Sequence, residues 1–516
     1  MIKVQRVEDG AEPPLLRMTV LPGPRATIAR LTLEVQGGLY AEVANGDPPA
    51  EVLSQALQSE WALQPGAPFT QSAWDSAKDR VLATLRSNGY RSAQWSGTAA
   101  QVNAEDNTVR LFVVADSGAL FRVGSIRIAG LQRFDEDAIM PAARELIGRP
   151  ATEQLIRDVQ DRLLALGLFE SIIIDVDESA ADPAQAPVLL ALRELPLQQA
   201  TVGIGYADDT GFQVTLEHTH RRILDTRWVM RNKLQLGQDQ NLWAGDLMSH
   251  LQEDGWRNLL AGQAEKLTTN DETRYSWYAR AGRTRDTVRI WRLAYAEYTR
   301  ARLETSAGIN DSDALSGNYH WTWRNVDDLR TPTRGTVWSL QGGAGYTQGS
   351  VTPPGSQLEA EDSGPFARLY GRVQGYLPLG NGFYGSARLE LGQVFVREAL
   401  SVPDTLLFRA GGDDSVRGYE YRSLGPELNG AVFSGSTLFT SSLQLARPIF
   451  ADQPAFLWAL FVDAGNASDG WNNMRPVVGY GAGLHWRSPV GPLRVDLAYG
   501  QEVRKFRLHF SVGVVF

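Results

Sequence analysis

A run of charged residues and glycines, GGDDSVRGYEYRSLGP at 411–426, lies between two segments that alternate like β-strands. An arginine beside a glycine can help to bind a phosphate, but a phosphate loop also needs a lysine and a following helix, which this run lacks. The planar guanidinium of Arg417 can instead pair with a carboxylate through two parallel hydrogen bonds. From these residues alone, Arg417 either makes such a pair inside a pore or is solvated. The strands and helices around the run must show which of these two alternatives applies.

Other residues that could do chemistry give little support for an enzyme. The chain has no cysteine and no G-x-S-x-G motif, so thiol catalysis and a serine nucleophile of that type are not expected. Two of its six histidines, His218 and His220, share a strand face, but no carboxylate on that face has metal-ligand spacing. The net charge of −9 argues against a nucleic-acid partner. We therefore expect no enzyme, no metal and no cofactor.

The residues after 197 alternate between apolar and polar side chains with a period of two, as β-strands do. In 506–516 the even-numbered positions are apolar, from Phe506 to Phe516, and the odd-numbered positions include arginine and histidine. Breaks at Gly, Asp, Asn and Pro divide this region into about sixteen strands. We predict that they start near residues 198, 211, 227, 239, 256, 274, 288, 314, 334, 365, 383, 437, 454, 476, 493 and 504.

Long alternating strands favour a transmembrane barrel over a soluble sandwich, although both alternate. The apolar parity is rich in aromatic residues, and 25 of the 30 Trp and Tyr residues follow residue 197. No run approaches the roughly 18 apolar residues of a membrane helix, which a closed barrel does not need. The region 197–516 is therefore predicted to be an antiparallel, all-β barrel.

The first 196 residues contain a repeat with an offset of 82 positions. GAPFTQSAWDSAKDR at 66–80 and GRPATEQLIRDVQDR at 148–162 share the spacing of Gly, Pro, Thr and a final Asp-Arg. In each copy the threonine, Thr70 or Thr152, can cap a helix N-terminus, and a stripe of apolar residues follows. Alternating segments flank the helices, so each copy is predicted to read strand, helix, helix, strand, strand, with domains at 26–120 and 121–196. Residues 1–25 are predicted to be the end of a further domain of this kind.

Several motifs, in this order, carry a family resemblance. The whole chain resembles the outer-membrane assembly factors of the BamA/TamA superfamily, and TamA-like members most. The stretches concerned are NVDDLRTPTRGTVWSL (325–340), VRGYEY (416–421), FVDAGN (461–466), YGAGLHWRSPVGPLRVDLAYG (480–500) and the terminal Phe516. VRGYEY is similar to the family's signature in the sixth extracellular loop.

The resemblance implies the fold class and the location. It implies α+β periplasmic POTRA repeats (a fragment at 1–25, then 26–120 and 121–196) followed by an all-β, about 16-stranded antiparallel transmembrane β-barrel at 197–516. TamA itself has three POTRA domains, whereas two complete units and a fragment are found here. The protein is then expected in the bacterial outer membrane, with its N-terminal domains in the periplasm.

The resemblance also implies a site. The sixth loop would fold into the barrel through Val416, Arg417, Gly418 and Tyr419, and Arg417 would meet Asp463 on the inner wall. Gly418 would allow a tight turn, and Tyr419 would pack.

A lateral seam is expected where the first and last barrel strands meet. It would involve Gly203, Gly205, Gly513 and Phe516, and glycines on both sides would weaken it. The implied function is the insertion or secretion of β-rich client proteins, such as autotransporters, through this seam. The partners would be the lipid bilayer, the clients and a TamB-like inner-membrane-anchored protein. A two-partner-type secretion pore is the alternative, and an outer-membrane barrel enzyme is a less favoured one.

Overall fold

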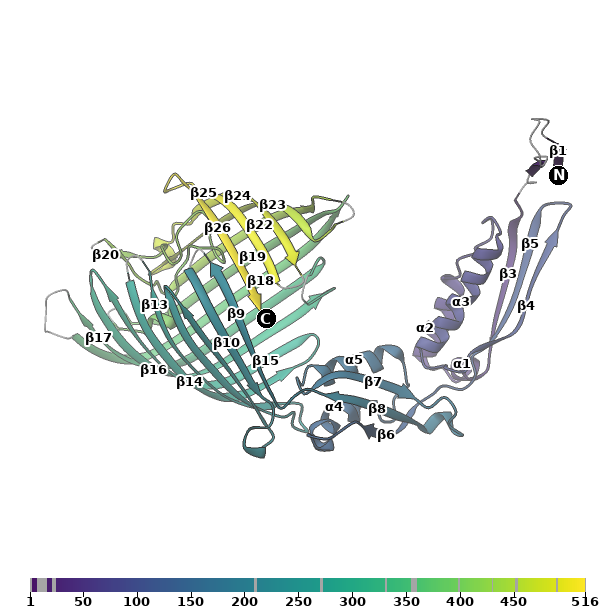
Figure 1. Ribbon diagram of the computed structural model, residues 1–516, viewed down its shortest axis with the longest axis horizontal. Coiled ribbons are helices and arrows are strands. Elements are labelled where there is room, and N and C mark those ends of the chain that lie inside the picture. The colour runs from purple at the N-terminus through teal and green to yellow at the C-terminus, as the bar shows by residue number, and fades with distance from the viewer. Residues whose placement is uncertain are drawn as a thin grey trace. The chain divides into compact units, whose positions relative to one another are not determined.

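The chain divides into two compact units, Met1–Leu195 and Pro196–Phe516. The structure, a computed structural model, describes residues 2–6, 16–20, 25–207, 211–269, 272–329, 332–353, 360–397, 400–428, 430–450, 453–488 and 491–515. Figure 1 shows a strand-rich C-terminal unit, in teal to yellow, and an N-terminal unit that contains the α-helices. Each unit is described separately below.

The N-terminal unit contains two three-stranded sheets of the same topology. In each, the strand that comes last in sequence lies in the middle, parallel to the first strand and antiparallel to the second. The first sheet has the order β3 (Thr27–Gln36), β5 (Thr108–Asp116), β4 (Gln94–Asn103), and the second has the order β6 (Val123–Ala129), β8 (Ala186–Glu194), β7 (Phe169–Val176). A further pair, β1 (Ile2–Arg6) and β2 (Leu16–Val20), precedes them.

The repeated motif forms the main helix of each sheet, α3 (Gln71–Ser87) and α5 (Glu153–Leu164). The predicted caps are confirmed, because the Oγ1 atoms of Thr70 and Thr152 each accept a 3.2 Å hydrogen bond from the backbone N–H three residues later. The apolar stripes are buried, as the pattern predicts. They consist of Ala77, Val81 and Leu85 on α3, and Leu155, Val159 and Leu163 on α5.

The prediction of two helices per copy is wrong for the first sheet, which has three. α1 (Gly38–Ala44) and α2 (Pro48–Ser59) precede α3. A single longer helix cannot form there, because Gly46 has a φ of 76° and Pro48 lacks the N–H that a helix interior requires. Asp47 between them instead caps α2 by accepting a 3.3 Å hydrogen bond from the Ala50 N–H. In the second sheet, short α4 (Met140–Ala143) precedes α5.

The C-terminal unit is a closed barrel of sixteen antiparallel strands in the described residues, which confirms the predicted barrel (Figure 1). Consecutive strands pair around the barrel, and the first strand also pairs with the last. The strands are β9 (Gln198–Ala207), β10 (Gly211–His220), β11 (Trp228–Gly237), β12 (Gln240–Ser249), β13 (Arg257–Thr268), β14 (Glu272–Asp286), β15 (Ile290–Thr305), β16 (Gly308–Val326), β17 (Gly335–Thr352), β18 (Ala360–Gly380), β19 (Phe383–Val396), β22 (Thr437–Pro448), β23 (Phe456–Ser468), β24 (Val477–Ser488), β25 (Gly491–Gly500) and β26 (Lys505–Val515).

The predicted strand starts lie close to the observed ones. The largest difference is at β16, predicted from 314 and observed from 308. The apolar–polar alternation starts later than the strand itself, because residues 308–313, GINDSD, are mostly polar at both odd and even positions. Backbone pairing with β17 extends this strand beyond its apolar pattern.

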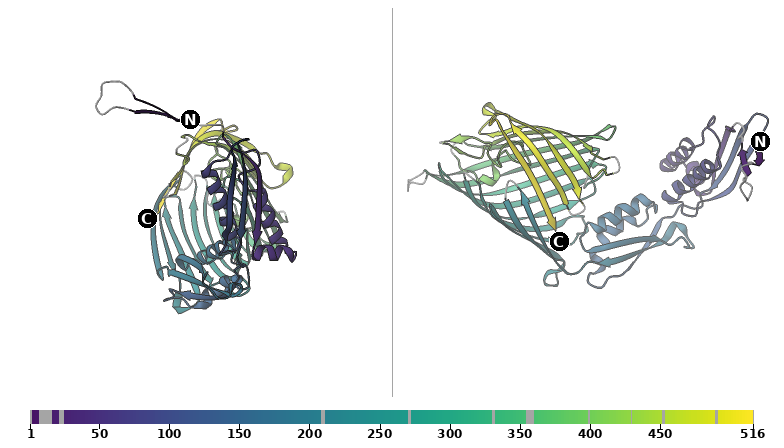
Figure 2. Two further views of the ribbon diagram at one scale, coloured as in Figure 1. Left: turned by 90° about the vertical axis from the view of Figure 1, so that its right-hand side faces the viewer. Right: turned by 45° about the horizontal axis from the view of Figure 1, so that its top comes forward.

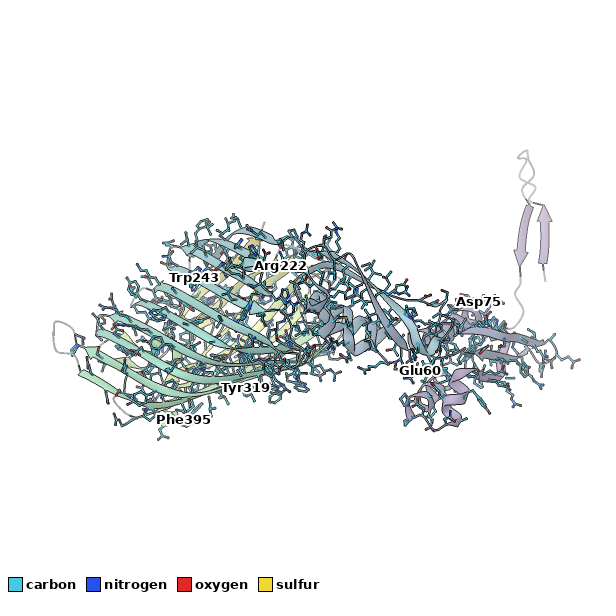
Figure 3. The ribbon with its side chains drawn as sticks, turned by 90° about the horizontal axis from the view of Figure 1, so that it is seen from below. Glu60, Asp75, Arg222, Trp243, Tyr319 and Phe395 are labelled. Carbon is cyan, nitrogen blue, oxygen red and sulfur yellow. The ribbon has the colours of Figure 1, made fainter. Side chains whose placement is uncertain are left out.

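The apolar parity of the strands faces outward, as expected of a barrel in lipid. Trp243, Tyr319 and Phe395 are exposed on the outside of the barrel (Figure 3). On β25, Leu497 is exposed outside while its neighbour Asp496 is buried inside. In the described part of the chain, no helix is long and apolar enough to cross a membrane.

Candidate functional site

The connection between β19 and β22, residues 397–436, is the sixth connection at its end of the barrel and the longest there, and it is called loop six below. It contains the VRGY motif and the short strands β20 (Glu427–Leu428) and β21 (Ala431–Val432). Side chains at its start, among them Phe408 and Ala410, pack in a buried cluster with Ala314, Phe366 and Leu438 of the barrel strands. Loop six therefore lies inside the barrel.

Arg417 is buried at the tip of loop six and is held by two carboxylates of the barrel wall. Its Nε and Nη2 atoms donate to Oδ2 and Oδ1 of Asp463 on β23, at 2.7 and 3.0 Å. Its Nη1 atom donates to Oδ2 of Asp496 on β25 at 2.9 Å. The guanidinium also lies over the ring of Phe461, 3.4 Å from the ring centroid. The structure thus brings Arg417 and Asp463 together, and we call Arg417, Asp463 and Asp496 the latch.

The residues around Arg417 fix its direction. The backbone N–H of Arg417 donates to Asp463 as well, at 3.1 Å. Gly418 has a φ of 96°, and an added Cβ would lie 2.8 Å from the backbone N of Gly500, so only glycine fits this turn without strain. The Tyr419 hydroxyl donates to the Val478 carbonyl at 3.1 Å, and Val416 is fully buried. All four motif residues are therefore docked on the wall.

Two opposite effects act on the charge of Arg417. Burial disfavours the guanidinium, but Asp463 and Asp496 more than offset it and raise the pKa of Arg417 above its ordinary value. Both carboxylates also have other partners. Ser442 donates to Asp463 at 2.6 Å, and the Nε2 of His485 lies 2.8 Å from Oδ1 of Asp496. The latch is thus a buried charge group whose polar atoms are well satisfied.

The last strand also holds the tip of loop six. The Gly418 backbone N–H donates to Nε2 of His509 on β26, at 2.9 Å. Since Nε2 accepts this bond, the ring proton lies on Nδ1, which faces the carboxylate of Asp413 in the loop. Arg507, two residues earlier on β26, forms an ion pair with Glu420 of the loop.

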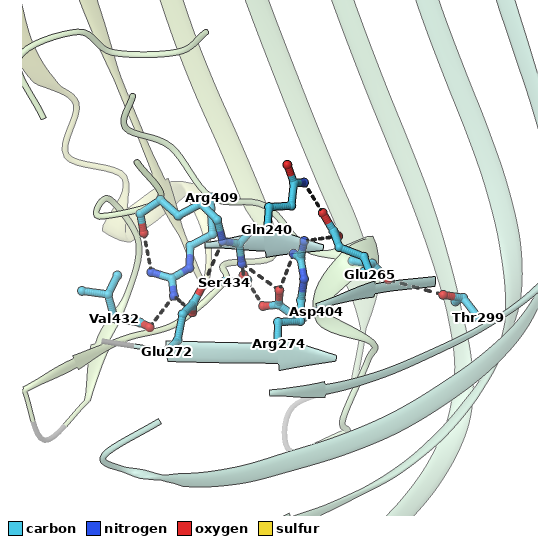
Figure 4. Close-up of polar contacts among 11 residues, drawn as sticks. Gln240, Glu265, Glu272, Arg274, Thr299, Asp404, Arg409, Val432 and Ser434 are labelled. Carbon is cyan, nitrogen blue, oxygen red and sulfur yellow. Dashed lines mark hydrogen bonds and ion pairs between the residues drawn. The ribbon is translucent and has the colours of Figure 1, made fainter. Parts of the chain in front are cut away.

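A second charged group holds the base of loop six on the opposite flank of the barrel (Figure 4). It joins side chains of β13 and β14 to three side chains of the loop. Asp404 accepts from Arg274 at 3.1 Å and from Arg422 at 2.7 Å, and Arg274 also pairs with a β13 glutamate at 2.9 Å. We call this group the base cluster, and it consists of Glu265, Glu272, Arg274, Asp404, Arg409 and Arg422.

The base cluster is buried and electrically balanced, with three arginines and three carboxylates. Burial alone would raise the pKa of Asp404, but Arg422 and Arg274 more than offset this and hold it well below its usual range. Burial likewise opposes the charge of Arg422, yet Asp404 and Glu272 raise its pKa. Arg409 pairs with Glu272 and donates to the Arg422 carbonyl at 2.9 Å. The base of the loop is therefore fixed by mutually dependent ion pairs.

The first and last barrel strands lie side by side in a short junction (Figure 2). β9 and β26 pair over five residues, from Gly203–Val515 to Ala207–Ser511, with Gly205 directly opposite Gly513. Every other junction between described barrel strands is longer. Its neighbours β25–β26 and β9–β10 pair over seven and ten residues. Phe516, also predicted at the seam, lies outside the described residues.

Several contacts of the site were not predicted from the sequence. The motifs in the sequence gave no role to Asp496, His485 or His509. The only signal for these three residues was that their side chains alternate toward the inside of the barrel, and many other residues share it.

A cavity of about 350 Å³ beside the latch is lined by Arg388, Arg494 and Gln444, among others. In the part of the chain that the structure describes, no three possible ligand side chains converge on a metal position.

Comparison with known proteins connects this geometry to a family. The Omp85 superfamily domain matches residues 199–516, more than half of the chain. Among curated proteins, outer membrane protein assembly factor BamA of Neisseria meningitidis serogroup B is 21% identical over 545 residues. The match covers 90% of this chain and 65% of that protein, so the chain spans slightly less than two thirds of the relative's length.

Two solved structures share the fold. BamA from Haemophilus ducreyi lacking POTRA domains 1–3 matches with a TM-score of 0.66 at 18% identity, covering 96% of this chain and 100% of that chain. CdiB from Escherichia coli matches with a TM-score of 0.51 at 14% identity, covering 96% and 91%. At these identities the likeness establishes the fold.

Proposed function

The chain belongs to the Omp85 superfamily, and from that premise we propose that it is an assembly and translocation factor, which inserts or secretes β-rich client proteins. It is located in the bacterial outer membrane, with its N-terminal domains in the periplasm. We assign the sheets at 26–120 and 121–196 to POTRA domains. The likeness to the H. ducreyi structure, which covers 96% of this chain, supports this assignment.

The proposed mechanism begins with the opening of the seam between β9 and β26. A net backbone hydrogen bond contributes only about 0.5–1.5 kcal/mol, so a junction of five residue pairs is the easiest of the sixteen to separate. At its centre Gly205 faces Gly513, and neither glycine contributes side-chain packing. The short, glycine-centred seam is the observation that carries the proposal.

An open seam would expose the hydrogen-bonding edge of β9. In lipid an unpaired backbone group costs several kcal/mol, so a client strand that pairs with this edge is strongly favoured over an unpaired one. The client strand would add by β-augmentation, and later strands would follow from it. No covalent bond is made or broken in this mechanism, and we propose that the protein is not an enzyme and uses no cofactor.

The clients and a further partner belong to the same proposal. We expect client outer-membrane proteins, autotransporters among them, because their β-rich segments can pair with β9. We also propose a TamB-like inner-membrane-anchored partner that binds the periplasmic domains. The exposed edge strands β4 and β7 each leave one row of backbone groups free of sheet pairing in the described sheets and offer a surface for it.

A disulfide across the seam tests the mechanism. The chain has no cysteine, so Ile204→Cys with Val514→Cys introduces one pair at directly opposed positions of β9 and β26. The matched control, Ile204→Cys with Val214→Cys, joins β9 to β10 at the same level and leaves the seam free. The measurement is the insertion of a barrel client into liposomes that contain the purified protein.

We expect oxidation of the seam pair to reduce client insertion at least tenfold, and reduction to restore it. The oxidised control pair should remain close to the unmodified protein. Full client insertion by the oxidised seam variant would refute lateral opening.

A further inference from the structure

The contacts of loop six fall into two groups that lie on opposite sides of the seam. At its base, Asp404, Arg409 and Arg422 bind side chains of β13 and β14. At its tip, the residues from 416 to 420 bind β23, β24, β25 and β26. Around the closed barrel, one route from β23 to β14 runs through β26, the seam and β9, and the other runs through β22 and β19 to β15. Loop six therefore spans the inside of the barrel from β13 and β14 to a wall that includes the seam strand β26.

The tip contacts reach the seam strand itself. His509 and Arg507 share the inward parity of β26, and both bind loop six, His509 through Gly418 and Arg507 through Glu420. His509 is 2% exposed, so its bond to the Gly418 N–H is shielded from water. Only one residue separates His509 from Ser511, where the pairing with β9 begins. A displacement of β26 at the seam thus acts directly on these contacts.

The two ends of the loop differ in how they can be released. The base cluster is a closed network, in which each buried charge has at least one buried partner on the strands or in the loop. Removing one member would leave others unpaired, which is costly in a buried site. At the tip, the contacts with β26 include the hydrogen bond from Gly418 to His509, the contact of Asp413 with the same histidine, and the partly exposed pair of Arg507 and Glu420. The connection to β26 is the part that can break first.

We infer that His509 and Arg507 are positioning residues that couple the tip of loop six to the final strand, so that the docked loop holds the seam closed. Opening of the seam then requires the tip to leave β26, or to move with it while the base stays fixed. This inference rests on the proposed function, in which the seam opens. It concerns the resting position of β26, which can be measured without a client.

The position of β26 can be measured by the distance between two spin labels. Val214→Cys on β10 and Leu497→Cys on β25 place both labels on exposed, outward positions on either side of the seam. In this background, His509→Leu removes the acceptor of the Gly418 N–H, and His509→Gln restores an acceptor. Lys505→Leu is the matched control, since Lys505 lies on the same strand and is exposed.

We expect His509→Leu to increase the fraction of molecules with a longer label distance at least threefold. His509→Gln should reverse most of this increase, and Lys505→Leu should have no effect. Arg507→Glu should also increase the longer-distance fraction, and Glu420→Arg added to it should restore the shorter distance. Recovery in these second variants separates a specific contact from general misfolding.

An unchanged distance distribution in both His509→Leu and Arg507→Glu would overturn the inference. The outcome is independent of client insertion. If the seam disulfide leaves insertion intact, the proposed function fails while the distance result still decides whether loop six holds β26.

Discussion

Replacement of Arg417 by alanine is the most direct perturbation of the latch. In Arg417→Ala, Asp463 and Asp496 would remain in place with 0% and 5% exposure and without their main cationic partner. Removing one partner of a buried ion pair typically costs about 3–5 kcal/mol. We therefore expect the docked position of the loop tip to lose a large part of its free energy.

The cost should lie slightly below the lower end of that range. Ser442 still donates to Asp463 at 2.6 Å, and His485 still contacts Asp496 at 2.8 Å. Each remaining hydrogen bond offsets part of the penalty, so about 2.7 kcal/mol is a reasonable value for the loss. With about 1.4 kcal/mol for each factor of ten, the undocked fraction of the tip should rise about 100-fold.

Hydrogen exchange measures this fraction directly. The backbone N–H groups at positions 417 and 418 donate to Asp463 and His509, so their exchange requires the tip to undock. Mass spectrometry of a peptide that covers 416–420 should show exchange about 100-fold faster in Arg417→Ala. Arg417→Lys should give a smaller increase, about tenfold, because an ammonium group cannot bind Asp463 through two parallel bonds while it also reaches Asp496.

Two outcomes would refute this reasoning. Exchange within threefold of the unmodified protein, in a folded Arg417→Ala barrel, would mean that the latch does not hold the tip. Equal effects of Arg417→Ala and Arg417→Lys would mean that the geometry of the guanidinium is unimportant.

Three further predictions test other parts of the structure. Gly479→Ala would place a Cβ 1.9 Å from the Arg417 carbonyl oxygen, so it should raise exchange at the tip at least tenfold, whereas Gly470→Ala, whose Cβ would meet no atom within 4 Å, should not. The pKa of Asp404 is lowered in the folded state, so its stabilisation is present above the unfolded-state value of about 4 and is lost as pH falls through the lower folded value. Thermal unfolding from pH 7 to pH 2 should show this acid-induced loss, and Asp404→Asn should be less stable at pH 7 and lose less on acidification. Thr152→Ala should cost about 1 kcal/mol of helix stability and speed exchange in the first turn of α5 about fivefold.

The barrel was predictable from the sequence because its strands follow a single rule. One parity faces lipid and must be apolar, so the pattern of 506–516 or of 493–500 is visible without any partner strand. The repeat in the N-terminal unit was predictable for a similar reason, since a capping threonine and an apolar stripe are local signals. The break between α1 and α2 was missed, although Gly46 and Pro48 mark it.

The site was predictable only where a motif carried it. VRGYEY and FVDAGN pointed to Arg417 and Asp463, which are 46 residues apart. Asp496 and His509 could not be assigned, because inward parity is shared by many residues and only the register of the last strands selects these two. The base cluster was missed entirely, since its members on β13, β14 and the loop come together through the path of loop six and not through any spacing in the sequence.

The two anchors of loop six also differ in when their partners are synthesised. Glu265, Glu272 and Arg274 precede the loop in the chain, whereas Asp463, Asp496 and His509 follow it. The base cluster thus needs no residue that follows the loop, whereas Arg417 has its two carboxylate partners only when strands from the last hundred residues are in place. A truncated or incompletely inserted barrel would thus display an unneutralised arginine, which offers a chemical signal by which unfinished copies differ from finished ones.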